Sequence, residues 1–184
     1  MATAAFLCAG LSGCGSPAAP LASPAPVAAA TDPDDAASAA QDSGTVTAVG
    51  PHTCIALNGR ADKNCTPGVT NPNVTQATIH QTICVRGWTA TIRPPASYTT
   101  QLKRQQMVAY GESGSLAGYE EDHLLPLEAG GNPTDPRNLW PEPRSGAHPA
   151  GEKDEAENAA KAAVCSGQMT LPQAQAKILA DWTH

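Results

Sequence analysis

The segment from residue 119 to residue 165 constrains the fold more than any other part of this 184-residue chain. It begins with a short strand that ends at Asp122-His123. Residues 128–137 contain a Gly-Gly pair and two prolines, a composition that only a loop accommodates. Residues 138–140 form a second short strand, which a proline ends, and residues 153–165 have the pattern of a helix with acidic residues in its first turn. The predicted order is strand, long loop, strand and helix.

Weaker patterns on either side of this segment predict further short elements. We expect a hairpin or loop around Asn58-Gly59, a short helix after Asn73 with Gln76 at its third position, a strand over residues 85–92, a helix over residues 97–110 and a final helix that Thr170 and Gln173 cap. The folded part of the chain, residues 45–184, is therefore predicted to be one small mixed α+β domain with short flanking helices.

The first 44 residues have the composition of an export signal followed by a tether. Residues 1–13 are apolar and end in Leu-Ser-Gly before Cys14, which resembles the lipobox of bacterial lipoproteins. The resemblance implies cleavage before Cys14 and attachment of lipid to its sulfur. A chance cysteine in a disordered tail is the alternative, because the run lacks a basic start. Residues 14–44 are rich in Ala, Pro, Ser and Asp, and we expect them to form a disordered tether.

The cysteines agree with export. Cys8 belongs to the expected signal and Cys14 to the lipid anchor, which leaves four for the folded part: Cys54, Cys65, Cys84 and Cys165. Four cysteines allow three pairings, and sequence alone does not choose among them. The pairing that we prefer joins Cys54 to Cys65 and Cys84 to Cys165, with free buried thiols as the alternative. Because there is no Cys-x-x-Cys pair, a zinc knuckle is not expected.

Residues of the 119–165 segment resemble a known catalytic motif. Asp122-His123 is followed by Pro126, Gly130-Gly131 and Asn138 at the spacing of the ββα-metal motif of HNH endonucleases. A wider likeness to small exported bacterial HNH-like proteins covers residues 82–89 and the C-terminal helix. The resemblance implies an HNH-type endonuclease that hydrolyses DNA, with RNA left open, and leaves a 5′-phosphate and a 3′-hydroxyl.

The same resemblance assigns roles to the motif residues. His123 is the expected general base, since an imidazole titrates near working pH. Asp122 is the expected ligand of a divalent cation, Mg²⁺ first, with Mn²⁺, Ca²⁺ and Zn²⁺ left open. Asn138 is expected to orient His123 by binding the loop backbone. The motif usually has a third residue on its helix, and we assign it to Asn158, with Asp154 in reserve.

Other assignments of the third residue remain open. Glu157 lies on the same helix, and His148 lies close in sequence but in the loop before the helix. Any of these helix residues could equally lie on a solvated face. Four cations surround the motif and could contact phosphates, although solvated surface charge explains them equally well: Arg137, Arg144, Lys153 and Lys161.

The charge balance limits what kind of nucleic-acid binding to expect. Eleven Lys and Arg face seventeen Asp and Glu, a formal charge of −6, so the chain has no broad basic surface. No recognition helix or zinc finger is visible, which favours a nuclease with little sequence preference. The expected location is outside the cell, on the membrane through the lipid anchor, or secreted. The alternative function is a non-catalytic surface-anchored module with an HNH-like fold, and no protein partner is evident.

Overall fold

The computed structural model describes residues 44–47 and 53–183. Within these residues the fold is mixed α+β, as predicted, with two antiparallel two-stranded sheets. The elements are β1 (Thr45–Val46), α2 (Trp88–Ile92), α3 (Ala96–Tyr110), β2 (Gly114–Ser115), β3 (Tyr119–His123), β4 (Leu139–Pro143), α4 (Ala150–Cys165) and α5 (Leu171–Asp181). The expected signal peptide, Cys14 and the tether up to residue 43 lie outside the described residues.

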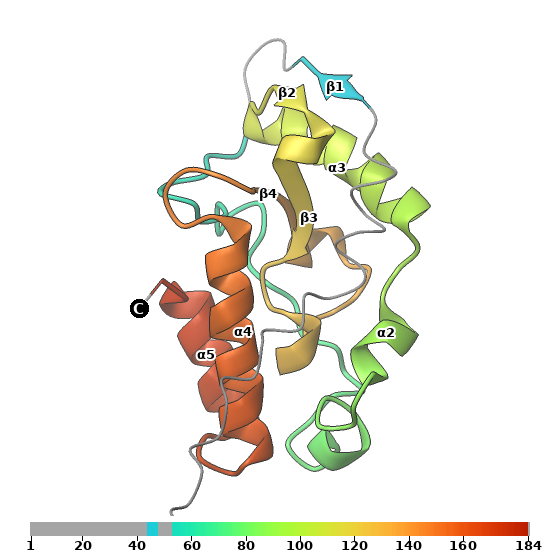
Figure 1. The fold of residues 1–184 in the computed structure, drawn as a ribbon, viewed down its shortest axis with the longest axis vertical. Coiled ribbons are helices and arrows are strands. Elements are labelled where there is room, and N and C mark those ends of the chain that lie inside the picture. Colours follow the sequence, from blue (N-terminus) through green and yellow to red (C-terminus); the bar gives the residue numbers. More distant parts are fainter. Residues whose placement is uncertain (1–43, 48–52, 184) are drawn as a thin grey trace, which may run out of the picture. The chain divides into compact units, whose positions relative to one another are not determined.

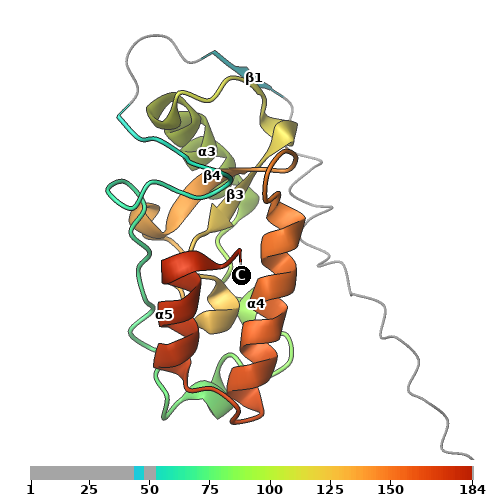
Figure 2. The same ribbon diagram turned by 90° about the vertical axis from the view of Figure 1, so that its left-hand side faces the viewer.

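The β3–β4 pair and α4 follow one another in the predicted order (Figure 1). β3 pairs antiparallel with β4, with Asp122 opposite Trp140 and His123 opposite Leu139. The helix α3 contacts both strands, whereas α4 and α5 contact each other. Both of these helices also contact η3 (Leu127–Ala129), a 3₁₀ turn in the loop between the strands (Figure 2). This turn of the loop therefore packs against the two C-terminal helices.

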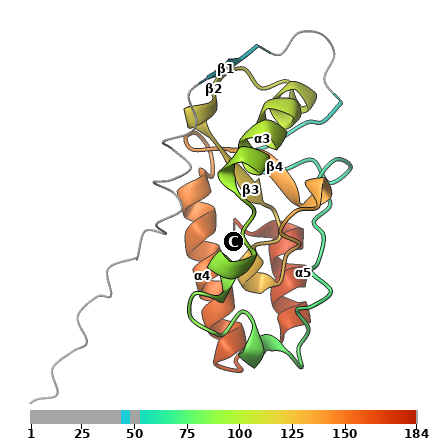
Figure 3. The same cartoon turned by 90° about the vertical axis from the view of Figure 1, so that its right-hand side faces the viewer.

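The predicted strand over residues 85–92 is wrong. Residues 82–88 form tight turns, with hydrogen bonds from Val85 N to Thr82 O and from Trp88 N to Val85 O, and the helix α2 follows. Gly87 has φ 78°, a left-handed conformation that a β-branched residue would not adopt, and this begins the helix instead of a strand. The short α2 then leads into α3 (Figure 3), which confirms the helix predicted over residues 97–110.

The two predicted helix caps had different outcomes. Thr170 and Gln173 form the expected reciprocal cap at the start of α5. The region after Asn73 forms turns and a short 3₁₀ helix, η1 (Ile79–Gln81), rather than an α-helix. Gln76 does not cap it, because its Oε1 accepts a hydrogen bond from Leu171 N at 2.6 Å. Gln76 therefore makes a tertiary hydrogen bond to the start of α5 in place of the predicted local capping bond.

Two disulfides have the preferred pairing, Cys54 with Cys65 and Cys84 with Cys165. The first closes a loop in which Asn58 and Gly59, with φ of 52° and 71°, make the expected hairpin turn. The second joins the turn before α2 to the last residue of α4. It lies beside an apolar cluster that unites three parts of the chain: Val74, Ile79, Ile83, Val164, Leu171 and Ala174. In the part of the chain that the structure describes, none of the helices could span a membrane.

Candidate active site

Asn138 holds the loop between β3 and β4 in place. Its side chain is fully buried, and its Oδ1 accepts hydrogen bonds from Leu125 N and Val69 N, both at 3.1 Å. Its Nδ2 donates to Leu125 O at 3.0 Å and to Asn132 O at 2.9 Å. One amide therefore ties both ends of the loop together and fixes the neighbouring segment at Val69.

Gly131 allows the loop to close this tightly. A Cβ at this position would lie 1.7 Å from Leu125 O and 2.9 Å from Asn138 Nδ2, closer than any side chain tolerates. The close approach of backbone to backbone therefore leaves room only for glycine at position 131. The loop conformation thus depends on a large buried amide on one side and on the absence of a side chain on the other.

His123 is the last residue of β3, and its ring is 4% exposed. Its Nε2 lies 3.0 Å from Pro133 O. Because a carbonyl oxygen only accepts hydrogen bonds, Nε2 carries the proton and donates it, and Nδ1 keeps its lone pair. Among the described residues, Nδ1 has no hydrogen-bond partner. The ring is therefore held in the tautomer that presents an unprotonated nitrogen.

Burial lowers the pKa of His123 from 6.5 to about 4, because the charged ring would lose its hydration. The positive charges of Arg93 and Lys153 lower this pKa further, and Asp122 and the hydrogen bond to Pro133 O oppose them. His123 is therefore neutral at pH 7. Sequence reasoning missed Arg93, whose charge acts on the ring although it follows α2, thirty residues earlier in the chain.

Asp122 forms an ion pair with a buried lysine. Lys153 is 1% exposed, and its Nζ donates to Asp122 Oδ2 at 2.5 Å and to His123 O at 2.9 Å. It also donates to Glu157 Oε1, one turn further along α4. An ammonium group has three N–H donors, so these three oxygens use all of them. Burial alone would lower the pKa of Lys153, but the surrounding carboxylates outweigh it and hold this pKa well above its usual value.

Glu142 completes a group that we call the Lys153 cluster: Asp122, Glu142, Lys153 and Glu157. Glu142 lies two residues after Trp140, the partner of Asp122 in the sheet, so Asp122 and Glu142 project from the same face. Glu142 is 1% exposed, and burial raises its pKa well above the usual value, as does the charge of Asp122. Burial also raises the pKa of Glu157 to about 8. Burial therefore favours the protonated form of both glutamates, in Glu142 by an upward shift of the pKa and in Glu157 up to about 8.

The expected metal ligands are not brought together. Asn158 is exposed, and its Nδ2 donates to Asp154 O at 2.9 Å. Asp154 and Asn158 each lie one residue after a member of the Lys153 cluster, which turns them about 100° around the helix. α4 thus presents Lys153 and Glu157 on the side toward Asp122, and the assignment of a metal ligand to Asn158 or Asp154 stays a prediction. Within the described residues, no three His, Cys, Asp or Glu side chains are grouped to hold a metal ion.

His148 is also turned away from Asp122. It lies in the loop before α4, as expected, and its Nδ1 is 2.8 Å from Glu152 Oε1. Its ring contacts the edge of the Trp182 ring, with the centroids 6.0 Å apart. His148 thus connects the start of α4 to the end of α5 and contributes no ligand beside β3.

The cations expected to contact phosphate all have carboxylate partners. For Lys153 the prediction of a phosphate contact is wrong, because the side chain is buried and all three of its N–H donors are already bound to protein oxygens. The other pairs are Arg137 with Asp135, at 2.7 Å, Arg144 with Glu120, at 3.1 Å, and Lys161 with Glu128, at 2.5 Å. Arg137 remains the most accessible of them, with 67% of its side chain exposed. A nucleic acid would have to compete with these pairs.

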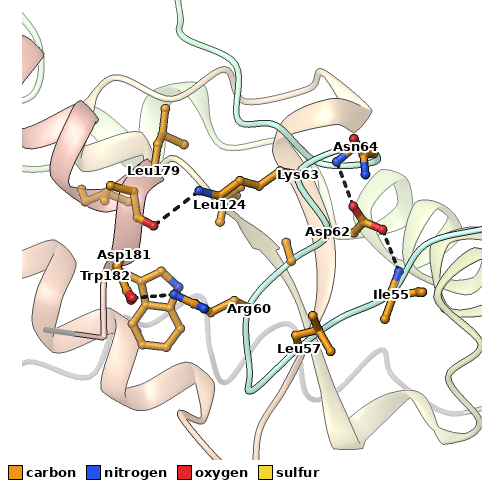
Figure 4. A pocket seen from close by; sticks show the side chains of 13 residues that line it. Ile55, Leu57, Arg60, Asp62, Lys63, Asn64, Leu124, Leu179, Asp181 and Trp182 are labelled. Carbon is orange, nitrogen blue, oxygen red and sulfur yellow. Dashed lines mark hydrogen bonds and ion pairs between the residues drawn. The ribbon is translucent and has the colours of Figure 1, made fainter.

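A pocket of about 390 Å³ lies between the Cys54–Cys65 loop and α5 (Figure 4). The exposed side chains of Ile55 and Leu57 line it, and Arg60 pairs with Asp181 at 2.5 Å. Lys63 donates to Ala180 O at 3.5 Å. None of the residues that the sequence assigned to the site lines this pocket. The pocket is therefore separate from the side chains of the motif.

In comparisons with known proteins, no family model, curated protein or solved structure matches the chain. The candidate site is therefore defined by its own geometry. His123 is neutral and fixed at the end of β3, Asn138 fixes the loop that follows it, and Asp122 holds a lysine on the side toward α4. The sequence holds one signal for the Lys153 cluster, the four-residue spacing of Lys153 and Glu157, which predicts an ion pair on one helix face but not that the face is buried.

Proposed function

We propose that the chain is an HNH-type endonuclease that hydrolyses phosphodiester bonds of DNA, with RNA open, and with little sequence preference. The observation that carries the proposal is the hydrogen bond from His123 Nε2 to Pro133 O, which leaves Nδ1 unprotonated. A neutral imidazole with a free lone pair is the group that a general base requires. The order of β3, loop, β4 and α4 and the buried Asn138 amide support the resemblance to the motif.

The proposed reaction is attack of water on phosphorus. His123 Nδ1 takes a proton from the water, the new P–O bond forms, and the bond from phosphorus to the 3′ oxygen breaks. The 3′ oxygen then takes a proton from solvent, leaving a 5′-phosphate and a 3′-hydroxyl. Arg93 is the candidate cation for the phosphate, because its charge already acts on the His123 ring. The expected metal ligands do not fit together, so this scheme has no metal step.

We also propose that the protein works outside the cytoplasm, on a lipid anchor at Cys14. Two disulfides are compatible with an exported protein, because such bonds persist in oxidising compartments. The Leu-Ser-Gly-Cys sequence that ends at Cys14 supports the anchor. The substrate would then be nucleic acid that reaches the cell surface.

The test compares two histidine variants of the full chain on supercoiled plasmid, with EDTA and with each divalent ion. His123→Gln keeps an amide that can donate to Pro133 O but removes the base, and we expect nicking to fall by about 100-fold or more. His148→Gln is the control and should nick at the wild-type rate. Equal nicking by wild type and His123→Gln would assign the activity to another site or to a contaminant.

A non-catalytic surface-anchored binding module is the second candidate. It is favoured by one observation, the pairing of all four expected phosphate-binding cations with carboxylates. If the wild-type chain nicks the plasmid under none of these conditions and also leaves a single-stranded RNA substrate intact under each of them, this second function replaces the first.

A further inference from the structure

We infer that Lys153 takes the place of the divalent cation beside Asp122, so that this site carries its positive charge on a side chain and does not bind a divalent metal ion. The inference rests on the proposed function in one respect: the HNH-type motif is the reason to expect a cation beside Asp122. Its test does not depend on cleavage, so the two proposals can fail separately.

The oxygen atoms around Lys153 are of the kind that a divalent cation would use. Nζ is 2.5 Å from Asp122 Oδ2 and 2.9 Å from His123 O, and Glu157 Oε1 is its third partner. Mg²⁺ and Ca²⁺ bind carboxylate and backbone oxygens of this type. Two of the three oxygens come from β3 and one from α4, the two elements between which the motif is expected to hold its metal. The ammonium group therefore occupies the expected cation position.

Geometry prevents a metal ion from sharing this position with the lysine. Lys153 is 1% exposed, and Asp122 is the carboxylate of β3 that the sequence assigned to the metal. A divalent ion bound to Asp122 would lie beside the ammonium group, and the two positive charges would repel each other. Expelling the ammonium would break three hydrogen bonds and move a buried side chain into solvent. The lysine therefore excludes the ion by both charge and space.

Removing the ammonium should reverse this exclusion. Lys153→Ala leaves the three oxygens that the ammonium bound, Asp122 Oδ2, His123 O and Glu157 Oε1, around the vacated space, and carboxylate and backbone oxygens are the ligands of a hard cation. A lysine with a similar ion pair elsewhere on the helix provides the matched control. Lys161 pairs with Glu128 at 2.5 Å and lies outside the cluster. Lys161→Ala therefore removes the same charge without opening the Lys153 cluster.

The experiment is a calorimetric titration of the full chain with MnCl₂, repeated with MgCl₂, for wild type, Lys153→Ala, Lys161→Ala and Asp122→Asn. We expect Lys153→Ala to bind Mn²⁺ at least about tenfold more tightly than wild type, because three ligands replace a repelling charge. Wild type, Lys161→Ala and Asp122→Asn should show the same weak binding.

Two results would overturn the inference. The first is a wild-type Mn²⁺ site that Asp122→Asn weakens tenfold or more, since Asp122 would then be a metal ligand despite the lysine. The second is a folded Lys153→Ala chain that gains no affinity. If Lys153→Ala does not fold, the comparison of wild type with Asp122→Asn decides alone: equal binding supports the inference, and weaker binding by Asp122→Asn contradicts it. Nicking of plasmid in EDTA, measured in parallel, bears on the nuclease proposal.

Discussion

Asn138 and Leu125 exchange two hydrogen bonds across the loop that follows β3: Leu125 N donates to Asn138 Oδ1 at 3.1 Å, and Asn138 Nδ2 donates to Leu125 O at 3.0 Å. The side chain thus pairs with a backbone segment in the way that a neighbouring strand would. Leu125 lies two residues after His123, so this pairing limits how far the end of β3 can move. The position of the imidazole depends on an amide from the opposite end of the loop.

Asn138→Ala should therefore destabilise the fold. The variant leaves the backbone groups of Leu125, Val69 and Asn132 without partners in the interior, and we expect the free energy of unfolding to fall by about 3 kcal/mol or more. Asn158→Ala is the matched control, because Asn158 is exposed, and should change it by about 0.5 kcal/mol or less. Urea unfolding measures both, and equal effects would contradict the structural role of Asn138.

His123 should make stability depend on pH. The pKa of His123 is about 4 in the folded chain and near 6.5 in the unfolded chain. Between these pH values the ring is protonated in the unfolded state and neutral in the folded state. The stability that the neutral ring provides is complete above pH 6.5 and is lost as pH falls toward 4. The difference corresponds to about 3 kcal/mol. Urea midpoints of wild type and His123→Gln should therefore diverge between pH 7 and pH 4, with wild type losing more, and parallel curves would show that the ring titrates normally.

Lys153→Ala should be far more costly than Lys161→Ala when no metal is added. Removing one partner from a buried ionic group leaves uncompensated charge and typically costs about 3–5 kcal/mol, whereas a partly exposed pair contributes about 0–1 kcal/mol. The cost for Lys153→Ala should shrink at pH 5, because the pKa of Glu157 is already raised to about 8 and the carboxyls can protonate. Thermal unfolding at pH 5 and pH 8 tests this, and a cost that grows at pH 5 would contradict it.

The two disulfides should differ in their contribution to stability. Cys84–Cys165 spans 81 residues and Cys54–Cys65 spans 11, so in the chain-entropy treatment their losses cost about 4.5 and about 3 kcal/mol respectively. Each pair can be replaced by two alanines and the free energy of unfolding measured in urea. A larger loss for the short loop would show that native contacts, not chain entropy, decide the difference.

Local signals predicted the elements that local contacts form. The helix α3, the turn at Asn58-Gly59 and the cap formed by Thr170 and Gln173 depend on residues within a few positions, and all three are as expected. The failed predictions concern segments that distant parts of the chain reshape. Residues 85–92 have a β-branched pattern, but the strand would need a partner, and turns ending at Gly87 prevent pairing. Gln76 binds α5 instead of capping its own helix.

The sequence allowed prediction of the site residues on β3 and in the loop, but not of those on α4. Asp122, His123 and Asn138 were identifiable by spacing, and the structure places them at the end of β3 and in the loop that follows, while their roles stay predictions. The helix residues were not, because choosing a face requires knowing how α4 turns toward β3, which apolar side chains far from the motif determine. A lysine in the first turns of an acidic helix also has the pattern of a solvated residue, whereas Lys153 is 1% exposed. Charge alone does not identify a buried ion pair.

The long disulfide has a consequence for how the chain would respond to a protease. Residues 145–147 form an exposed bend between β4 and α4, and this bend lies between Cys84 and Cys165 along the chain. A protease that cuts the backbone there would leave two fragments that remain covalently joined. The clipped molecule would migrate as a full-length chain on a non-reducing gel, and a reducing agent would be needed to reveal the damage.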